Sequence, residues 1–485
     1  MRIVPKAAAL SLLAATQFVL VLDASIVNVA LPSIGRDLGV APEDLSWVVN
    51  AYILMFGGFL LLGGRVGDYL GHRRVYAGGL ILFTAASLAG ALAQSGLWLS
   101  IARGLQGLGA ALASPAALAL LMALFGEGAE RSKALGVWAA LGGSGGAAGA
   151  ILGGVLTDGL GWQAVLLVNV PVGAGAVALT PRLLPDSRTT AARAGARGFD
   201  LAGAVSVTAG LALLVYALVD ANDAGFRSTQ TLVLAAAALV LLLGFVAIER
   251  VSQRPLVPLR IFGNRPLRGA NLVTLLNTGA MFPMFFFITL YTQDVLGYSA
   301  VQSGLAQLPL AATIAASATL APRVVVRVGY KATMVVGLAV VAGGLWWFGA
   351  VSPDGSFPGD LLGPSLVVGI GAGAVWVSSM VAATSGADPA EAGLASGLIN
   401  TSQQLGGALG IAALVAVATA RTASVLEDGA DRLVAVTEGF RAGFAGGALV
   451  VAAAGAALAA LLLSSATSRR HASAARASRA VQASR

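Results

Sequence analysis

Apolar blocks separated by short polar breaks follow one another along almost the whole chain. Each block has about the 20 residues that an α-helix needs to cross a bilayer. The strands of a membrane β-barrel would instead give shorter segments of alternating polarity. The pattern therefore predicts an all-α polytopic membrane protein with fourteen transmembrane helices, over residues 7–31, 45–63, 75–94, 98–122, 134–156, 164–180, 200–219, 231–248, 269–293, 303–321, 332–350, 361–385, 395–420 and 440–465.

The composition excludes an ordinary soluble protein. The chain is 57% hydrophobic and 11% charged, and its mean hydropathy is +0.84. The first apolar run, 7–31, is longer than the ~7–15 residues of a signal-peptide core, so we interpret it as the first span. Cysteine is absent, which excludes disulfides, thiolate metal sites and cysteine nucleophiles.

The distribution of lysine and arginine predicts the orientation of the helices. With the N-terminus inside, 24 of the 30 basic residues fall in cytoplasmic segments, and Arg103 lies within a span. Such an excess marks the cytoplasmic side of a membrane protein. We expect both termini to be cytoplasmic, with the basic tail close to anionic lipid headgroups. The sequence shows no basic face with interleaved aromatic residues, so we expect no nucleic-acid partner. The basic residues expected outside are Arg36, Arg227, Arg421, Arg432 and Arg441.

A weak internal repeat predicts two similar halves. When Gly71 is aligned with Gly329, Arg65 matches Arg323 in the equivalent cytoplasmic loop. Repeated halves with a site between them are typical of transporters. Two of the predicted helices fall between the halves as an insert. The expected units are an N-terminal six-helix bundle (1–180), a linker with two inserted helices (181–250), a C-terminal six-helix bundle (251–465) and a basic cytoplasmic tail (466–485).

Asp23 is the one carboxylate that lies well inside a predicted span. It is about eight residues, or ~12 Å, from the outer end of the first helix. A charge at a helix centre costs about 2.5–3.5 kcal/mol on insertion scales, so such a residue indicates a function. We predict that Asp23 carries a proton across the membrane. A structural ion pair that joins two helices is the alternative. His72 and His471 lie in a loop and in the tail, so neither can relay protons through the membrane.

Arg103 begins the fourth span in RGLQGLG, at a depth similar to that of Asp23. An ion pair between them is therefore feasible, and breaking and remaking it would gate protonation. The alternative is an interfacial arginine that extends to the headgroups. Gln106 and Gly107 are expected to face the same interior.

Two glycine-rich segments have predicted structural roles. The fifth span repeats glycine at four-residue spacing, which allows close helix packing. The loop 64–74 combines tight glycine turns with charged side chains, which predicts a conformational latch at the cytoplasmic ends of the helices. Membrane anchoring by positive charge is the alternative for this loop. The expected packing residues are Gly145, Gly149, Gly153 and Gly154, and the expected latch residues are Gly64, Arg65, Asp68, Gly71 and Arg73.

Aromatic and methionine residues, above all in MFPMFFF at 281–287, offer soft surfaces suited to apolar solutes. In a membrane bundle, such residues can equally pack against other helices or face lipid. The candidate residues for a substrate cavity are Asn28, Tyr52, Met55, Gln106, Phe282, Phe286, Trp376 and Asn400.

Several motifs together resemble one family, the fourteen-span drug:proton antiporters of the major facilitator superfamily (EmrB/QacA-like). The resemblance covers nearly the whole chain. It implies two six-helix bundles plus two additional helices in a monomer of the bacterial cytoplasmic membrane. The matching strings are LDASIVNVALPSI with Asp23, GRVGDYLGHRR with Asp68, RGLQGLG with Arg103, GWQAVLLVNVPVG with Asn169, VLGYSAVQSGLAQLP, and GLASGLINTSQQLGGALG.

The resemblance also implies an activity. It is the export of amphipathic, possibly cationic drugs in exchange for protons, with the proton gradient as energy source and neither a cofactor nor a metal. One departure concerns the antiporter motif of the fifth span, where Ala150 stands after Gly149 in place of the usual proline. That change puts the bend of this helix and the antiport direction in question.

Other functions are less consistent with the residues. An exporter of an endogenous metabolite, antibiotic or lipid would have a similar sequence. A membrane enzyme is not expected, because no His, metal set or nucleophile pair lies within the bilayer. Residues 142–146 formally match G-x-S-x-G, but that motif needs a strand-to-helix turn and a histidine partner. A receptor is not expected either, since no signalling domain is present.

Overall fold

The chain is almost entirely helical in the computed structural model, which describes residues 6–125, 129–185, 200–225, 227–252, 255, 259–384 and 392–483. No strand occurs among these residues. Within the described part of the chain, eleven helices are long and apolar enough to cross a membrane. Three shorter apolar segments lie within further helices, at Asp44–Leu60, Ala148–Leu160 and Val205–Leu218. Together they match the fourteen predicted spans one for one, which confirms the predicted fold class.

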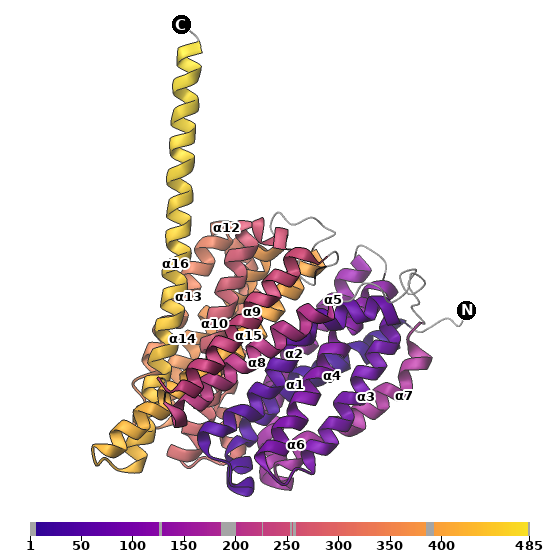
Figure 1. Ribbon diagram of the computed structural model, residues 1–485, viewed down its shortest axis with the longest axis vertical. Helices are drawn as coiled ribbons and strands as arrows, with labels where there is room; N and C mark the ends of the chain where they lie inside the picture. The colour runs from indigo at the N-terminus through magenta and orange to yellow at the C-terminus, as the bar shows by residue number, and fades with distance from the viewer. Residues whose placement is uncertain are drawn as a thin grey trace.

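The N-terminal half forms one bundle (Figure 1). Its last span is made of two helices, α6 and α7, that follow each other directly. Prolines within α1 and α4 are tolerated because neighbouring helices can satisfy the freed backbone groups. The helices are α1 (Lys6–Leu38), α2 (Pro42–Leu70), α3 (His72–Ala91), α4 (Gly96–Leu124), α5 (Ala129–Leu160), α6 (Gln163–Leu167) and α7 (Asn169–Leu183).

The C-terminal half forms a second bundle beside the first (Figure 1). Polar residues of the loops cap its helices, as where Ser299 and Gln302 form a capping box at the start of α11. The elements are η2 (Leu259–Gly263), α10 (Arg265–Leu290), η3 (Tyr291–Val295), α11 (Ala300–Ala306), α12 (Leu308–Val328), α13 (Tyr330–Phe348), η4 (Phe357–Leu361), α14 (Leu362–Thr384), α15 (Ala392–Glu427) and α16 (Arg432–Ala483).

The two halves repeat one order of helix pairing. The pairs α1–α5, α2–α4, α3–α4 and α3–α7 correspond to α10–α15, α12–α14, α13–α14 and α13–α16. The aligned glycines of the sequence repeat have the same role in each half. Gly71 (φ 89°) and Gly329 (φ 85°) each end one helix and begin the next. Glycine adopts this left-handed backbone without the strain that a side chain would cause.

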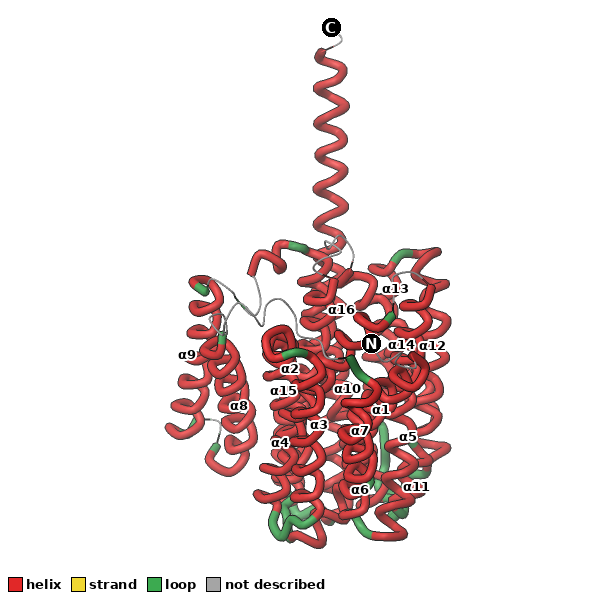
Figure 2. The backbone as a smooth tube through the Cα atoms, turned by 90° about the vertical axis from the view of Figure 1, so that its right-hand side faces the viewer, coloured by secondary structure: helices red, strands yellow, loops and turns green. Residues whose placement is uncertain are grey.

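The insert forms a hairpin of two helices, α8 (Leu201–Ala224) and α9 (Thr229–Val251), at one side of the bundles (Figure 2). Helix α8 packs against both α2 and α15, so it lies along the line where the two halves meet. Its Tyr216 ring lies 6.1 Å from the ring of Trp47 on α2. Helix α9 exposes many large apolar side chains, as a lipid-facing helix does, including Leu232, Val233, Leu239, Val240 and Leu243.

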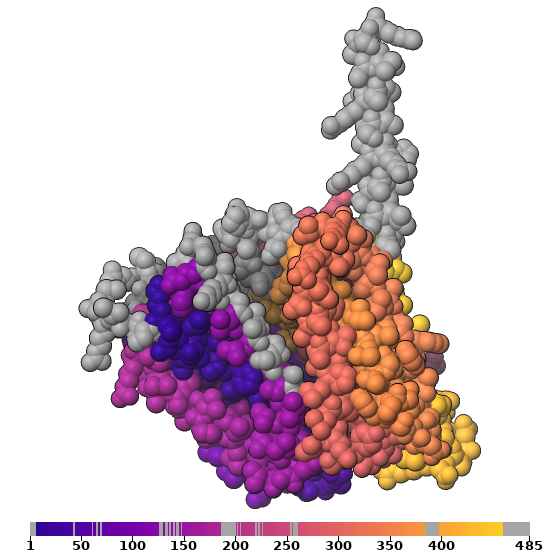
Figure 3. Space-filling model, turned by 180° about the vertical axis from the view of Figure 1, so that it is seen from behind, coloured from indigo at the N-terminus to yellow at the C-terminus, as the bar shows by residue number. Residues whose placement is uncertain are grey.

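The two ends of the bundles differ. We call the end with Lys6 and Glu130 the inner end, following the predicted topology, and the end with Leu38 and Gly96 the outer end. Helix α16 extends beyond the inner end to Ala483 (Figure 1). The halves touch at the outer end and are separated by a hollow nearer the inner end (Figure 3).

Candidate functional site

A buried ion pair joins α1 to α4. Nη1 of Arg103 lies 2.6 Å from Oδ2 of Asp23, and the side chains are 1% and 0% exposed. The structure therefore brings together the two charged residues that the sequence placed at similar depth. Because Arg103 is buried and paired, it does not extend to the headgroups.

Neutral side chains complete the surroundings of the carboxylate. Oδ1 of Asp23 accepts hydrogen bonds from Nδ2 of Asn169 at 2.5 Å and from Nε2 of Gln106 at 3.2 Å. Gln106 also donates to the Ser87 hydroxyl at 2.7 Å, and this hydroxyl donates to the Phe83 carbonyl. Helices α1, α4 and α7 thus meet at one carboxylate, and α3 joins them through Gln106. Three donors to an ionised carboxylate offset much of the cost of its burial.

Arg103 has partners besides Asp23. Its Nε donates to the Val48 carbonyl of α2 at 3.1 Å, and Nη1 lies 3.1 Å from the Gln106 side-chain oxygen. The guanidinium carbon lies 4.4 Å from the centre of the Tyr52 ring, which is a cation–π contact. The Tyr52 hydroxyl in turn donates to the Leu20 carbonyl of α1 at 3.2 Å. Arg103 would therefore keep several contacts if Asp23 lost its charge.

The pair is suited to a proton-dependent change of structure. An ion pair in a site of low dielectric is stable only while both members are charged, and removing one partner typically costs about 3–5 kcal/mol. Binding one proton at Asp23 would remove its charge and free α1 from its ionic link to α4. Loss of the charge on Asp23 would therefore change the contacts between these two helices.

The sequence indicated part of this network and missed the rest. The sequence predicts Asp23, Arg103 and Gln106 as site residues. It includes Asn169 only as part of a motif, and it does not single out Ser87. Ser87 lies in the string AASLAGA, where a small hydroxyl among apolar residues gives little signal. Neutral polar residues become recognisable as partners only when the fold places them beside a charge.

The corresponding region of the C-terminal half is polar. The hydrogen bonds described there involve neutral groups. The Ser402 hydroxyl of α15 donates to the Asn271 side chain of α10 at 2.7 Å, and the Thr278 hydroxyl donates to the Gln403 carbonyl at 3.0 Å. The charged network thus lies in the N-terminal half, and α10 and α15 of the other half contribute neutral polar groups.

The candidate cavity residues differ in burial. Tyr52, Gln106 and Phe286 are almost fully buried, and their part in substrate binding stays a prediction. The first two contact the ion pair, and the Phe286 ring packs edge-on to Phe287. Trp376 is 42% exposed on α14.

The remaining cavity candidates are half-buried. The amide of Asn28 donates to the Ala24 carbonyl of its own helix at 3.4 Å. Met55 lies near Gly104 of α4, and the Phe282 ring occupies the space that a side chain at Gly407 would need. Asn400 lies on α15. These residues lie on both halves, and their part in substrate binding stays a prediction.

The predicted latch is described in part. Nη1 of Arg73 donates to the Leu184 carbonyl at 3.2 Å, which links the start of α3 to the end of α7. Gly64 lies within α2, near Pro115 of α4. The side chains of Arg65 and Asp68 lie outside the described residues. The contacts described here join helices within the N-terminal half.

The glycines of α5 allow this helix to approach α1 closely on both sides of Asp23. A side chain at Gly145 would meet the Phe18 carbonyl at 2.7 Å, one at Gly149 the Leu22 carbonyl at 2.9 Å, and one at Gly153 the Ile26 carbonyl at 2.7 Å. The segment of α1 that carries the carboxylate therefore lies directly against α5. A shift of this segment would therefore change its packing against α5.

The same helix continues into the contact between the two halves. A side chain at Gly154 would lie 2.5 Å from Cα of Val301 on α11, and one at Gly304 would overlap the Ala150 carbonyl. Helix α5 runs unbroken through Ala150, where the antiporter family that the motifs resemble usually has proline. Ala150 therefore lies at the interface of the two halves.

Polar contacts close the outer end. The carboxylate of Asp158, near the end of α5, accepts from the backbone N–H groups of Ala300 and Val301 at 3.2 and 3.0 Å. The first N–H groups of α11 have no acceptor within their own helix. The N-terminus of a helix also favours a negative charge nearby. The amide of Gln293 also donates to the Val29 carbonyl at 2.9 Å. Both contacts join one half to the other.

Known proteins resemble this chain over most of its length. The model of the Major Facilitator Superfamily matches residues 13–411. The cephamycin export protein CmcT of Amycolatopsis lactamdurans is 43% identical over 411 residues, which cover 84% of each chain. The puromycin resistance protein pur8 of Streptomyces alboniger is 40% identical over 433 residues, covering 89% of this chain and 85% of that protein. The solved structure of the nucleoside transporter NupG has a TM-score of 0.65 at 15% identity and covers 93% of this chain and 99% of its own, so it shows the shared fold.

Proposed function

Because this chain belongs to the major facilitator superfamily, we propose that it exports antibiotics or other amphipathic drugs in exchange for protons, by alternating access. Membership of the family makes it a multi-pass membrane transporter and not an enzyme. The one-for-one match to fourteen spans favours the drug:proton antiporters that the motifs resemble. The names of CmcT and pur8 favour antibiotics as the substrate class.

The buried pair of Asp23 and Arg103 is the observation that carries the proposal. In the proposed cycle, Asp23 takes a proton from the outside and releases it to the cytoplasm. While Asp23 is protonated, Arg103 retains the Val48 carbonyl and the Tyr52 ring as partners. When the proton leaves, the ion pair forms again and holds α1 against α4. Substrate and proton then occupy the transporter at different stages of the cycle.

The packing of α5 offers a route from the proton site to the contact between the halves. Gly145, Gly149 and Gly153 lie against the turns of α1 on both sides of Asp23. The same helix carries Asp158, which binds the N-terminus of α11 in the other half. A change at Asp23 can therefore be transmitted along one rigid helix to the closed outer end. The proton site and the outer closure are coupled only if each of them shifts the same equilibrium between the inward-open and outward-open conformations. Variants at each site can test this.

This arrangement supports assigning the structure to the inward-facing state. The halves touch at the outer end and are separated by a hollow toward the inner end (Figure 3). With the N-terminus in the cytoplasm, that hollow would admit substrate from the cell or from the inner leaflet. The reverse movement would open the outer end and release the substrate outside.

Each proton supplies a limited free energy. Moving one elementary charge across 100 mV is worth about 2.3 kcal/mol, before any contribution from the pH difference. Because one buried carboxylate lies at the centre of the site, we propose one proton for each substrate molecule. A neutral substrate would then be exported with net movement of one charge.

Transport in proteoliposomes tests the proposed function. The purified chain is reconstituted, a pH gradient is imposed, and uptake of labelled puromycin and of a cephamycin is followed. We expect uptake of at least one probe that depends on the gradient and stops when a protonophore collapses it. Uptake at the same rate and to the same level without a gradient would contradict proton coupling.

A further inference from the structure

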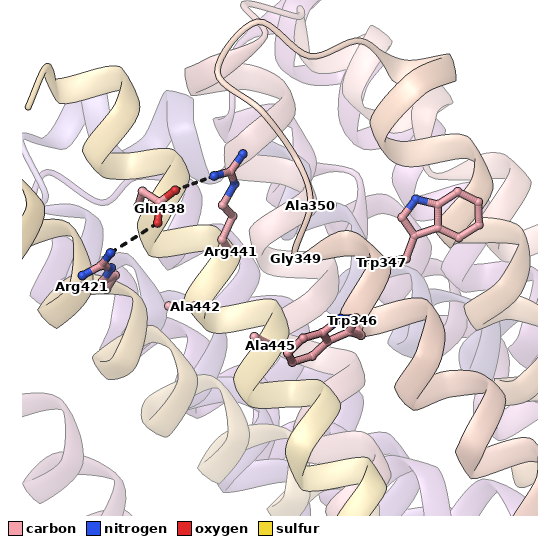
Figure 4. Close-up of a pocket in the computed structure, with 9 residues that line it drawn as sticks. All are labelled: Trp346, Trp347, Gly349, Ala350, Arg421, Glu438, Arg441, Ala442 and Ala445. Atoms are coloured by element: carbon pink, nitrogen blue, oxygen red, sulfur yellow. Dashed lines mark hydrogen bonds and ion pairs between the residues drawn. The ribbon is translucent and has the colours of Figure 1, made fainter.

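A pocket with a volume of about 640 Å³ lies near the outer end of the C-terminal half, away from the ion-pair network. It is formed where α13 ends beside α15 and α16 (Figure 4). Its lining combines aromatic, charged and small residues, which are Trp346, Trp347, Gly349, Ala350, Arg421, Glu438, Arg441, Ala442 and Ala445.

The charged part of the pocket has an excess of positive charge. Glu438 lies between two arginines, with Oε1 2.5 Å from Nη1 of Arg441 and Oε2 3.6 Å from Nη2 of Arg421 (Figure 4). Arg441 is fixed further by a hydrogen bond from its Nε to the Val351 carbonyl at 2.6 Å. One carboxylate is thus shared by two guanidinium groups. The pocket therefore favours an anion.

Arg421 is the member of this group that is available to a ligand. Its side chain is 48% exposed, and its contact with Glu438 is long for an ion pair. A guanidinium group presents five N–H donors in a planar arrangement that matches two oxygens of a phosphate. Arg441, by contrast, has its Nε and Nη1 groups committed within the protein.

The apolar part of the pocket lies at the level of the membrane boundary. Trp346 and Trp347 occupy the last turn of α13 and are 63% and 48% exposed. Tryptophan is enriched where the hydrocarbon of a bilayer meets the headgroups. Arg421 follows the predicted span 395–420 directly, and Arg441 lies at the start of the predicted span 440–465. Aromatic surface and positive charge thus meet at one depth.

We propose that this pocket binds an anionic phospholipid of the outer leaflet. The phosphate accepts hydrogen bonds from Arg421, and an acyl chain lies along Trp346 and Ala445 toward the membrane interior. A zwitterionic headgroup would bring a second cation against the arginines, so an anionic lipid such as phosphatidylglycerol is preferred. Free phosphate would leave the exposed tryptophan surface uncovered. Lipid binding at this pocket requires neither the substrate nor proton coupling.

Quenching of tryptophan fluorescence by brominated lipid tests the proposal. The full chain is placed in phosphatidylcholine nanodiscs that contain increasing fractions of brominated phosphatidylglycerol or of brominated phosphatidylcholine. We expect about fivefold stronger apparent binding of the brominated phosphatidylglycerol, as expected for one arginine close to an anionic lipid. The double variant Trp346→Phe/Trp347→Phe should lose this excess quenching, which assigns it to the pocket.

Arg421→Gln should abolish the preference for phosphatidylglycerol. The matched control is Arg432→Gln, which removes the same charge from an exposed position at the same end of the molecule but outside the pocket lining. This control should keep the preference. Equal quenching by the two brominated lipids would overturn the proposal. So would a preference that persists in Arg421→Gln, or displacement of the brominated lipid by millimolar inorganic phosphate.

Discussion

Asn169 donates a hydrogen bond to the carboxylate of Asp23 at 2.5 Å, although the two residues are 146 positions apart in the chain. This bond joins α7, the last helix of the first bundle, to α1, the first. Asn169 shares the Oδ1 atom of Asp23 with Gln106, whereas Oδ2 faces Arg103. The ionised carboxylate is thus bound by helices from both ends of the N-terminal half.

Replacing Asn169 with alanine should destabilise the ion-pair network. A hydrogen bond to a charged group is worth about 1.5–3 kcal/mol, and its loss leaves Oδ1 of Asp23 with the Gln106 amide as its donor. The melting temperature should therefore fall, and gradient-driven uptake should fall about tenfold or more. The measurements are thermal unfolding and initial rates of uptake in proteoliposomes.

Asn28→Ala is the matched control for Asn169→Ala, because the Asn28 amide bonds within its own helix. This control should leave the melting temperature unchanged, whatever it does to the rate. An unchanged melting temperature in Asn169→Ala, or an equal fall in the control, would show that Asn169 does not stabilise the carboxylate.

The Tyr52 ring should matter more than its hydroxyl. Tyr52→Phe keeps the ring under Arg103 and removes the hydrogen bond to Leu20. Losing one such hydrogen bond costs ~0.5 kcal/mol, so the transport rate should stay within about threefold of the original. Tyr52→Ala also removes the cation–π contact and leaves a cavity, so transport should fall about tenfold or more and the melting temperature should fall. Initial rates and thermal unfolding would be compared. Equal losses in both variants would assign the role to the hydroxyl.

Adding one methyl group at Gly154 should weaken the closed outer end. A Cβ there would lie 2.5 Å from the Val301 backbone, so the halves must move apart. Because the chain has no cysteine, a single cysteine in place of buried Val29 reports this separation. Gly154→Ala should increase labelling of that cysteine by an impermeant maleimide added from outside.

Gly146→Ala is the control for Gly154→Ala on the same helix. A Cβ at Gly146 meets no atom within 4 Å, so labelling of the cysteine should not change. If Gly154→Ala labelled no faster than this control, α5 and α11 would not form the outer closure.

Removing the Asp158 carboxylate should shift the protein toward the outward-open state. Asp158→Ala leaves the first N–H groups of α11 without their acceptor, at a cost of about 0.5–2 kcal/mol for a helix cap. Spin labels at exposed positions 160 and 305 would report the distance between the halves. The population with the longer distance should grow by roughly two- to thirtyfold relative to the closed one. An unchanged distance distribution would rule out this contact as a closure.

The sequence predicts the helices and the charged centre of the site for clear physical reasons. Apolar blocks of bilayer length have few alternatives to a spanning helix. Asp23 and Arg103 were recognisable because each is costly to bury alone in an apolar environment, so each needs a partner. Gly71 and Gly329 could be aligned because both halves need the same left-handed turn.

The sequence does not show which apolar face of a helix meets lipid and which meets another helix, because both faces are hydrophobic. From the sequence, Trp376 and Phe286 are equally plausible cavity residues, yet the Trp376 side chain is half exposed and the Phe286 side chain is buried. Contacts such as that between Asp158 and α11 depend on the state of the transporter. They follow from the arrangement of the two halves, and the local pattern of polar and apolar residues does not determine that arrangement.

Proton movement caused by substrate tests the role of Asp23 most directly. A pH-sensitive dye enclosed in proteoliposomes would record proton flux when a transported antibiotic is added to the original chain, to Asp23→Asn and to Asp37→Asn, which changes an exposed carboxylate on the same helix. We predict substrate-dependent proton flux in the original chain and in Asp37→Asn, and none in Asp23→Asn, although that variant inserts and folds. Undiminished flux in Asp23→Asn would contradict the account.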